Sequence, residues 1–251
     1  MKDFFRLVLW EIEENWRFPS LEIIAAILMY FSLTSRSFGI PKTYNQVLSY
    51  SVNVVYSFWL LMFEVVFIAV FFSRSVAEQI EKREILTLFA HPIKRTTVLL
   101  AKFLTNMLVI LLVISASVII YGLFIGLGPL HPVHYITILV AFLQLLFFSA
   151  ISLACSVFSK SSWASIIIPI VTLFALMFIA PQDQANSYIS PLGSIATVYR
   201  YLISQLIPIE SYTFGTPPST ATFIGAVLFP VTISAFLLTL SFIYFRKMEV
   251  D

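Results

Sequence analysis

Long apolar stretches, separated by short polar ones, recur along the whole chain. Six of them predict membrane-crossing helices, over residues 21–35, 47–72, 98–127, 135–158, 163–180 and 222–245. A crossing takes about 20 apolar residues, so the first helix is short and the third must tilt or protrude. Because a helix satisfies its backbone hydrogen bonds internally, we predict an all-α integral membrane protein with six transmembrane helices.

The first eighteen residues predict an amphipathic helix. Its apolar face contains Phe4, Phe5, Val8, Leu9, Ile12 and Trp16. Its polar face contains Lys2, Arg6, Glu13 and Arg17. This distribution is typical of a helix that lies in the membrane interface, so we expect residues 1–18 to rest on the bilayer surface.

The densest cluster of charge joins the second and third spans, over residues 73–96. So many ionised groups cannot lie in hydrocarbon, and the segment must be in water. Glu78 and Lys82 are four residues apart in the order that favours a helix. The apolar positions before and after Arg83 fall on opposite sides of a helical wheel, so we predict a break near Arg83-Glu84. A short second helix follows and ends at His91-Pro92, because the residue before proline leaves the helical region.

This loop resembles that of the ABC-2 type membrane-spanning subunits of ABC transporters. Their pattern is E-R-G-T-L-E-L-L-L-(S/A)-x-P-(I/V)-x-R, followed by a helix with an early G/A-K. The matching residues here are Glu81, Lys82, Ile85, Leu88, Phe89, Ala90, Pro92, Ile93, Arg95 and the pair Ala101-Lys102. Arg83 stands where the family pattern has glycine.

The resemblance implies that residues 73–95 contain a cytoplasmic coupling helix that docks on a separate ABC ATPase (nucleotide-binding) subunit. The implied ATPase-coupling residues are Glu81, Glu84, Ile85, Leu86, Leu88, Phe89, Pro92 and Arg95. It also implies an exporter whose path is formed by two permease subunits, identical or paralogous. ATP and Mg²⁺ would bind the partner ATPase, since no G-x-x-x-x-G-K-(S/T) motif occurs in this chain. We therefore expect neither a cofactor nor enzyme activity in the chain itself.

Residues 181–220 separate the last two spans and have mixed character. Ser190-Pro191 is a favourable helix start, and the pattern predicts a helix over 195–207 that ends before Pro208. This helix is too short and polar to cross the membrane. We expect it to lie at the outer interface or to re-enter the bilayer, as short helices in the resembled family do.

Composition and charge agree with a single membrane domain over residues 1–251. The chain is 59% hydrophobic and only 11% charged, against about 25% charged in soluble domains. Its net charge of +2 gives no support for nucleic-acid binding. Twelve of the fifteen basic residues fall on one side if both termini are cytoplasmic. This bias predicts a multi-pass plasma-membrane protein with cytoplasmic N- and C-termini in contact with membrane lipid.

Glu64 is the ionisable residue placed deepest in an apolar stretch. It lies nine residues before Ser73, about 13 Å from the water-exposed loop at 1.5 Å per residue. Such a group indicates a substrate path or proton relay, or else a paired glutamate that orients the second span. Lys102 would have to reach inward to pair with it. Asn53, in the outer half of the same span, is a second candidate for the path. The alternatives to an ABC permease are a membrane-embedded enzyme with catalytic Glu64 and an ion-coupled transporter with Glu64 as ion site.

Overall fold

The computed structural model describes residues 2–16, 58–84, 94–124, 126–179, 191–206 and 218–247 of the chain. Its helices are α1 (Lys2–Trp16), α4 (Phe58–Phe72), η3 (Ser73–Glu78), α5 (Gln79–Glu81), α7 (Arg95–Phe124), α8 (Pro132–Ser159), α9 (Ser162–Ile179), α10 (Pro191–Leu206) and α12 (Thr220–Lys247). Within these ranges every regular element is helical, as predicted. Of these, η3 alone is a π-helix, and it joins α4 to α5 without a break.

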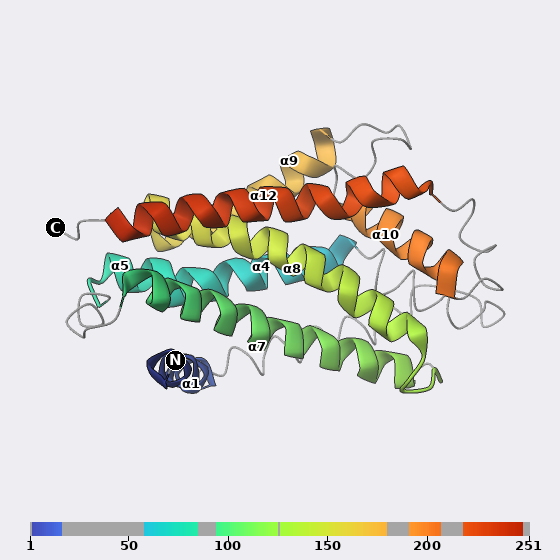
Figure 1. Ribbon diagram of the computed structural model, residues 1–251, viewed down its shortest axis with the longest axis horizontal. Helices are drawn as coiled ribbons and strands as arrows, with labels where there is room; N and C mark the ends of the chain where they lie inside the picture. Colours follow the sequence, from blue (N-terminus) through green and yellow to red (C-terminus); the bar gives the residue numbers. More distant parts are fainter. Residues whose placement is uncertain are drawn as a thin grey trace.

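The helices form an elongated bundle with α8 at its centre (Figure 1). Helix α8 packs against α4, α7, α9, α10 and α12, which explains why most of its side chains are buried. The long helices follow the long axis of the bundle, whereas α1 is seen nearly end-on and lies across one end. The end of α5, the start of α7 and the end of α12 lie at that same end, and α10 lies at the other.

Three described helices are long and apolar enough to cross a membrane: Arg95–Leu123, Pro132–Ser159 and Thr220–Lys247. A shorter apolar helix covers Ser162–Leu176. The predicted first span lies outside the described residues, and the second is described only from Phe58 onward. The described part of the chain is therefore all-helical, with helices fit to cross a membrane, and the count of six spans stays a prediction.

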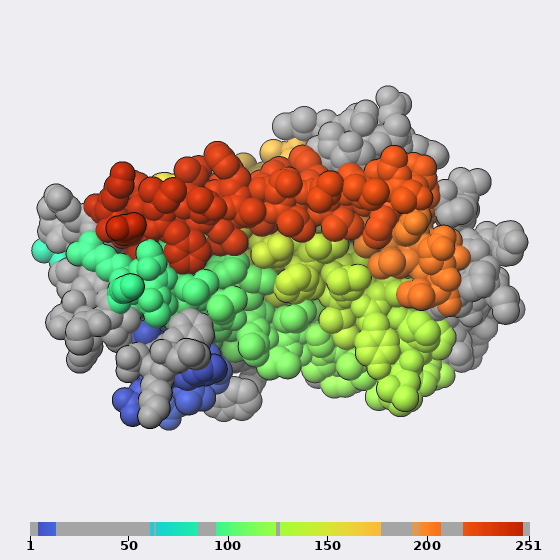
Figure 2. Space-filling model, in the orientation of Figure 1, coloured from blue at the N-terminus to red at the C-terminus, as the bar shows by residue number. Residues whose placement is uncertain are grey.

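Helix α12 has the most open surface of the three long apolar helices. Only 17% of its most apolar stretch is buried inside the chain, against 61% for α8. Figure 2 shows α12 uncovered along one whole side of the bundle. Ile224, Leu228 and Phe236 are among its exposed apolar side chains. This surface faces lipid or another protein chain, because water would not favour it.

The predicted helix between spans five and six is present as α10. It begins at Pro191, four residues before the predicted start, and ends at Leu206. Val198, Tyr199 and Ile203 are buried against the bundle, whereas Leu206 is 60% exposed. Helix α10 packs on α8 and α12. Its location at the outer interface or within the bilayer stays a prediction.

Helices α7 and α8 approach each other closely beside the turn that joins them. His131 caps α8 by accepting a hydrogen bond from the Val133 backbone N–H at Nδ1, and Pro132 occupies the first turn. The His134 ring lies over Gly122 of α7, and its Nε2 is 3.0 Å from the Gly128 carbonyl oxygen. A Cβ atom on Gly122 would overlap the imidazole of His134. Glycine is therefore required sterically at this crossing.

We predict that Gly122→Ala destabilises the protein by about 1–3 kcal/mol, the usual range for overpacking a tight contact. Thermal unfolding in detergent micelles should show a lower melting temperature. Gly128→Ala is the matched control, because an added Cβ there meets no atom within 4 Å. Most of the loss should disappear in a His134→Ala background, where the clashing ring is absent. An unchanged melting temperature for Gly122→Ala would contradict the packing described.

Candidate functional site

The candidate site is the end of the bundle where the charged loop joins α5 to α7. The predicted break near Arg83-Glu84 is present: α5 ends at Glu81, and Lys82, Arg83 and Glu84 form a turn. Arg83 has φ 61°, the left-handed conformation that favours glycine. Its backbone N–H donates to the Ile80 carbonyl at 3.1 Å. The glycine of the family pattern is therefore replaced by an arginine that keeps the geometry of a helix stop.

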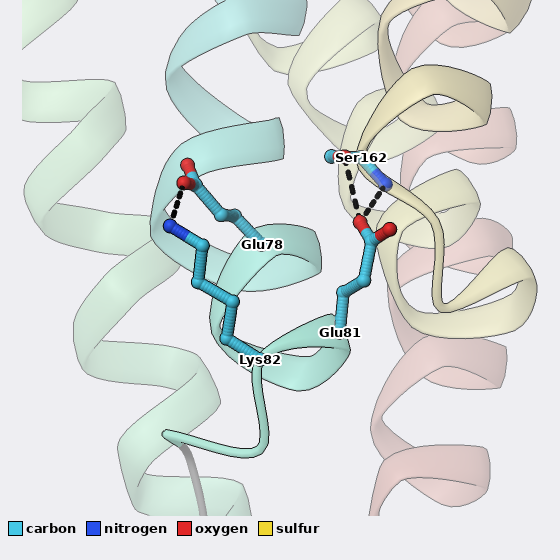
Figure 3. A network of polar contacts seen from close by, with 4 residues as sticks. All are labelled: Glu78, Glu81, Lys82 and Ser162. Atoms are coloured by element: carbon cyan, nitrogen blue, oxygen red, sulfur yellow. Dashed lines mark hydrogen bonds and ion pairs between the residues drawn. The ribbon is translucent and has the colours of Figure 1, made fainter.

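Glu81 links this end of the second span to the start of the fifth. Its Oε2 accepts hydrogen bonds from the Ser162 backbone N–H at 3.0 Å and from Ser162 Oγ at 2.7 Å (Figure 3). Ser162 is the first residue of α9. Glu81 thus caps α9 from another element, and its negative charge lies at the positive end of the α9 dipole.

The electrostatics of Glu81 follow from that contact. The two hydrogen bonds from Ser162 lower the pKa of the Glu81 carboxyl below its usual value, so it is ionised at neutral pH. On the opposite side of the helix Lys82 Nζ pairs with Glu78 Oε1 at 2.5 Å, as the spacing predicted (Figure 3). The hydrogen bond to Glu78 raises the pKa of Lys82. Because it is exposed, the Glu78–Lys82 pair supports the helix only weakly.

The π-helix η3 adds buried polar contacts to two other spans. Ser73 Oγ donates to the Ser162 carbonyl oxygen at 2.8 Å, so Ser162 is held from both ends of the η3–α5 segment. Asn106 Nδ2 of α7 donates to Ser75 Oγ at 2.5 Å. One turn before Asn106, the Phe103 ring lies 5.8 Å from the ring of Phe72. The end of this helical segment beside the charged loop is therefore bonded to α9 and to α7 together.

The amphipathic helix α1 is joined to α7 by a buried ion pair. Lys102 Nζ contacts Glu11 Oε1, and the side chains are 1% and 3% exposed. The Lys102 ammonium also lies 5.8 Å from the centre of the Trp10 ring. Leu7 packs beside the pair on Val98 and Ala101. The partner of Lys102 is therefore Glu11 of α1 rather than Glu64.

The faces of α1 differ in part from the predicted ones. Phe5 and Leu9 are 61% and 65% exposed, as expected of side chains that face lipid. Leu7 and Glu11 lie instead against α7. The helix therefore has an apolar outer face, a polar face and a third face that binds the bundle.

Glu64 lies in α4, and its side chain has little access to solvent. It is 8% exposed, and its Oε1 has no hydrogen-bond partner among the described residues. Ser149 and Ser152 of α8 are fully buried, and their Oγ atoms also lack partners there. Ser156 Oγ lies 3.5 Å from the Phe72 carbonyl oxygen, which sets the register of α4 against α8. The two helices run in the same direction (Figure 1). Glu64 is eight residues before Phe72 in α4, and Ser149 is seven residues before Ser156 in α8, so the two side chains lie at about the same depth along the bundle.

The remaining predicted site residues are less fully placed. Glu84 is exposed in the turn after α5, and Arg95 is the first residue of α7. Glu81 and Arg95 lie at the same end of the bundle but share no described contact. The residues outside the described ranges are Ile85, Leu86, Leu88, Phe89, Pro92 and Asn53.

A comparison with protein families decides the class of this molecule. The pattern of the ABC-2 family transporter proteins matches residues 18–250, nearly the whole chain. The chain belongs to the ABC-2 transporter family. No curated protein matches it at a significant level.

Membership in the ABC-2 family defines the general role of the protein. ABC-2 proteins are the permeases of ABC transporters, which are membrane transport components and not themselves catalysts, and they generally associate with an ABC ATPase. Transport is therefore favoured over the alternative of a membrane-embedded enzyme.

Two residues of this ABC-2 permease were not identified from the sequence. Ser162 is a serine before an apolar stretch, which is an ordinary helix-start signal, and its bond to Glu81 spans 81 residues. Glu11 is one of several acids in the first helix. Two features of the sequence could have indicated it: Glu11 lies one turn after Leu7, and Lys102 lies in an apolar stretch that offers no acid close in sequence.

We predict that Lys102→Met destabilises the protein by roughly 3–5 kcal/mol, because it leaves the Glu11 carboxylate buried without its partner. The double variant Glu11→Leu, Lys102→Met should recover much of that loss, since no charge is then buried. The measurement is thermal unfolding of the wild type, the single variants Glu11→Leu and Lys102→Met, and the double variant in the same detergent. If each single variant is as stable as the double variant, the two charges are not coupled in the folded protein.

Proposed function

We propose that this ABC-2 protein is the permease subunit of an ATP-driven exporter, coupled to a separate ATPase through residues 73–95. The observation that carries the proposal is the contact of Glu81 with Ser162. Glu81 belongs to the motif that resembles the family's coupling segment, and its hydrogen bonds lead directly to Ser162, the first residue of the apolar helix α9. Movement of the loop is therefore transferred to α9.

The proposed route has a docking part and a transmitting part. Leu88 and Phe89 provide the docking surface, because burying each apolar side chain in a partner cleft contributes about 1.5–3 kcal/mol. Glu81 and Ser73 transmit motion to α9, and Ser75 transmits it to α7 through Asn106. When ATP closes the ATPase dimer, these bonds displace the spans together. Cargo shifts the two states only through its differential affinity for them.

The arrangement of the chain supports the orientation and the assembly that we propose. The ends of α5 and α12 and the start of α7 lie at the same end of the bundle as α1, and with the adjoining turns these segments contain nine of the fifteen basic residues, which favours a cytoplasmic location in the plasma membrane. The open apolar side of α12 is one of the surfaces available to lipid or to a second permease. Two copies, or one copy and a paralogue, would form the path between them.

We predict that replacing Leu88 and Phe89 with aspartate abolishes retention of the ATPase, because two charges would be desolvated at the docking surface. Ser162→Ala should instead retain the ATPase but reduce permease-dependent ATP hydrolysis, since it removes one of the two hydrogen bonds to Glu81. The measurements are co-purification of the tagged permease with its ATPase and ATP hydrolysis by the purified complex. Because the ATPase is cytoplasmic, retention through this loop also reports the orientation.

The matched control is Lys160→Ala, which changes an exposed residue in the turn between α8 and α9. It should alter neither retention nor hydrolysis. Normal retention and normal hydrolysis by the Leu88, Phe89 double variant would disprove the coupling assignment. Hydrolysis unchanged in Ser162→Ala would leave docking in place but exclude Glu81–Ser162 as the transmitting contact.

A second role, in the substrate path, is proposed for Glu64. Three polar groups that are buried at similar depth in the neighbouring helices α4 and α8 support it: Glu64, Ser149 and Ser152. Buried polar groups without partners are rare in folded proteins and mark sites where a ligand, ion or water completes the hydrogen bonding. Asn53 would extend this path outward along the second span.

We predict that Glu64→Gln leaves the complex assembled but changes the pH dependence of its ATP hydrolysis, because the titrating carboxyl is removed. The measurement is ATP hydrolysis in proteoliposomes between pH 5 and 9, with internal pH followed by a dye. Ser149→Ala tests the neighbouring group without changing charge. If Glu64→Leu hydrolyses ATP with the wild-type pH profile, Glu64 is a structural residue and the proton relay is excluded.

A further inference from the structure

A cavity of about 490 Å³ opens at the end of the bundle that we propose to be cytoplasmic. Among the described residues it is lined by Lys94, Arg95 and Thr96 at the start of α7 and by Arg246 in the last turn of α12. Two segments about 150 residues apart in the sequence thus place three basic side chains around one hollow. Its volume is within the range of sites that hold a small ligand.

The ionisable groups among the described lining residues of this cavity are all basic. Basic side chains gathered around one hollow attract an anion. The first turn of α7 contains no acidic residue, so its backbone N–H groups add to the positive potential. Thr96 supplies a hydroxyl donor. Basic side chains, backbone amides and a hydroxyl are the donors that bind phosphate.

The position of the cavity indicates which phosphate compound it binds. It lies between the start of α7 and the end of α12, two helices that are long and apolar enough to cross a membrane. About one turn farther into these helices, Leu100, Ile243 and Tyr244 are exposed by 40%, 50% and 39%. A ligand with an anionic head and an apolar tail would contact both regions. A free phosphate ion would use only the first.

We propose that this cavity is a binding site for the phosphate headgroup of an anionic phospholipid of the inner leaflet. Basic pockets between transmembrane helices on the cytoplasmic side bind such headgroups in other membrane proteins. Arg246 and Lys94 hold the phosphate from the two helices, and the acyl chains follow the apolar side chains below. The lipid thereby joins the end of the last span to the start of the third, independently of the ATPase.

The test measures the thermal stability of the purified full-length permease in nanodiscs of phosphatidylcholine with increasing phosphatidylglycerol. A ligand that binds only the folded state raises the melting temperature in proportion to its occupancy. The wild type should be stabilised in a saturable manner. The double variant Lys94→Gln, Arg246→Gln should need about thirtyfold more phosphatidylglycerol for the same rise, from the loss of two surface charges. Its fold is checked by its melting temperature in pure phosphatidylcholine.

The controls distinguish a lipid headgroup from free phosphate, and the charges of this cavity from basic charge elsewhere on the protein. Lys160→Gln removes an exposed basic residue elsewhere and should behave as the wild type. Lys94→Arg with Arg246→Lys keeps both charges and should retain the lipid effect. Inorganic phosphate in phosphatidylcholine nanodiscs should have no effect, and an equal stabilisation by it would overturn the lipid assignment. The proposal also fails if the double variant responds to phosphatidylglycerol as the wild type does.

Discussion

Lys102 has a positive charge without access to water, and the organisation of this end of the protein depends on how that charge is compensated. Removing an ammonium and a carboxylate from water costs several kcal/mol for each, and only close pairing offsets it. Glu11 meets that requirement only if α1 lies across the first turns of α7. The position of α1 is thereby fixed, with Phe5 and Leu9 directed outward. Phe103 and Asn106, on the next turn of α7, contact the second span.

Two kinds of contact meet at this end, and they differ in how easily they break. The Glu11–Lys102 pair is buried, so separating it would leave a charge in an apolar environment. The Glu81–Ser162 contact is exposed, and water can replace either partner at little cost. The first contact therefore behaves as a permanent connection between α1 and α7. The second can be made and broken more easily, which is the property that the proposed transmission from the loop to α9 would need.

The predictable part of this structure is the local part. Apolar periodicity located α7, α8, α9, α10 and α12 to within a few residues, because the membrane requires continuous apolar helices. The break at Arg83 was also predictable, since apolar positions change sides there, even though arginine gives no sign of a left-handed φ. The pairings Glu81–Ser162 and Glu11–Lys102 were not, because each joins residues at least 81 positions apart through the packing of helices. Glu11 could not be identified as the partner of Lys102 for the same reason: depth along one span says nothing about a helix that arrives from the N-terminus.

The π-helical turn in the second span has a consequence for how that span can move. A π turn contains about one residue more than an α turn, and each α-helical residue advances the side chains by roughly 100°. The angle about the helix axis between side chains before η3, such as Phe72, and those after it, such as Glu81, therefore differs from the angle in a regular α-helix. Relaxing this turn to α geometry would rotate Glu81 about the helix axis without moving the helix sideways. The second span thus has a built-in means of torsion, distinct from any tilting of the bundle.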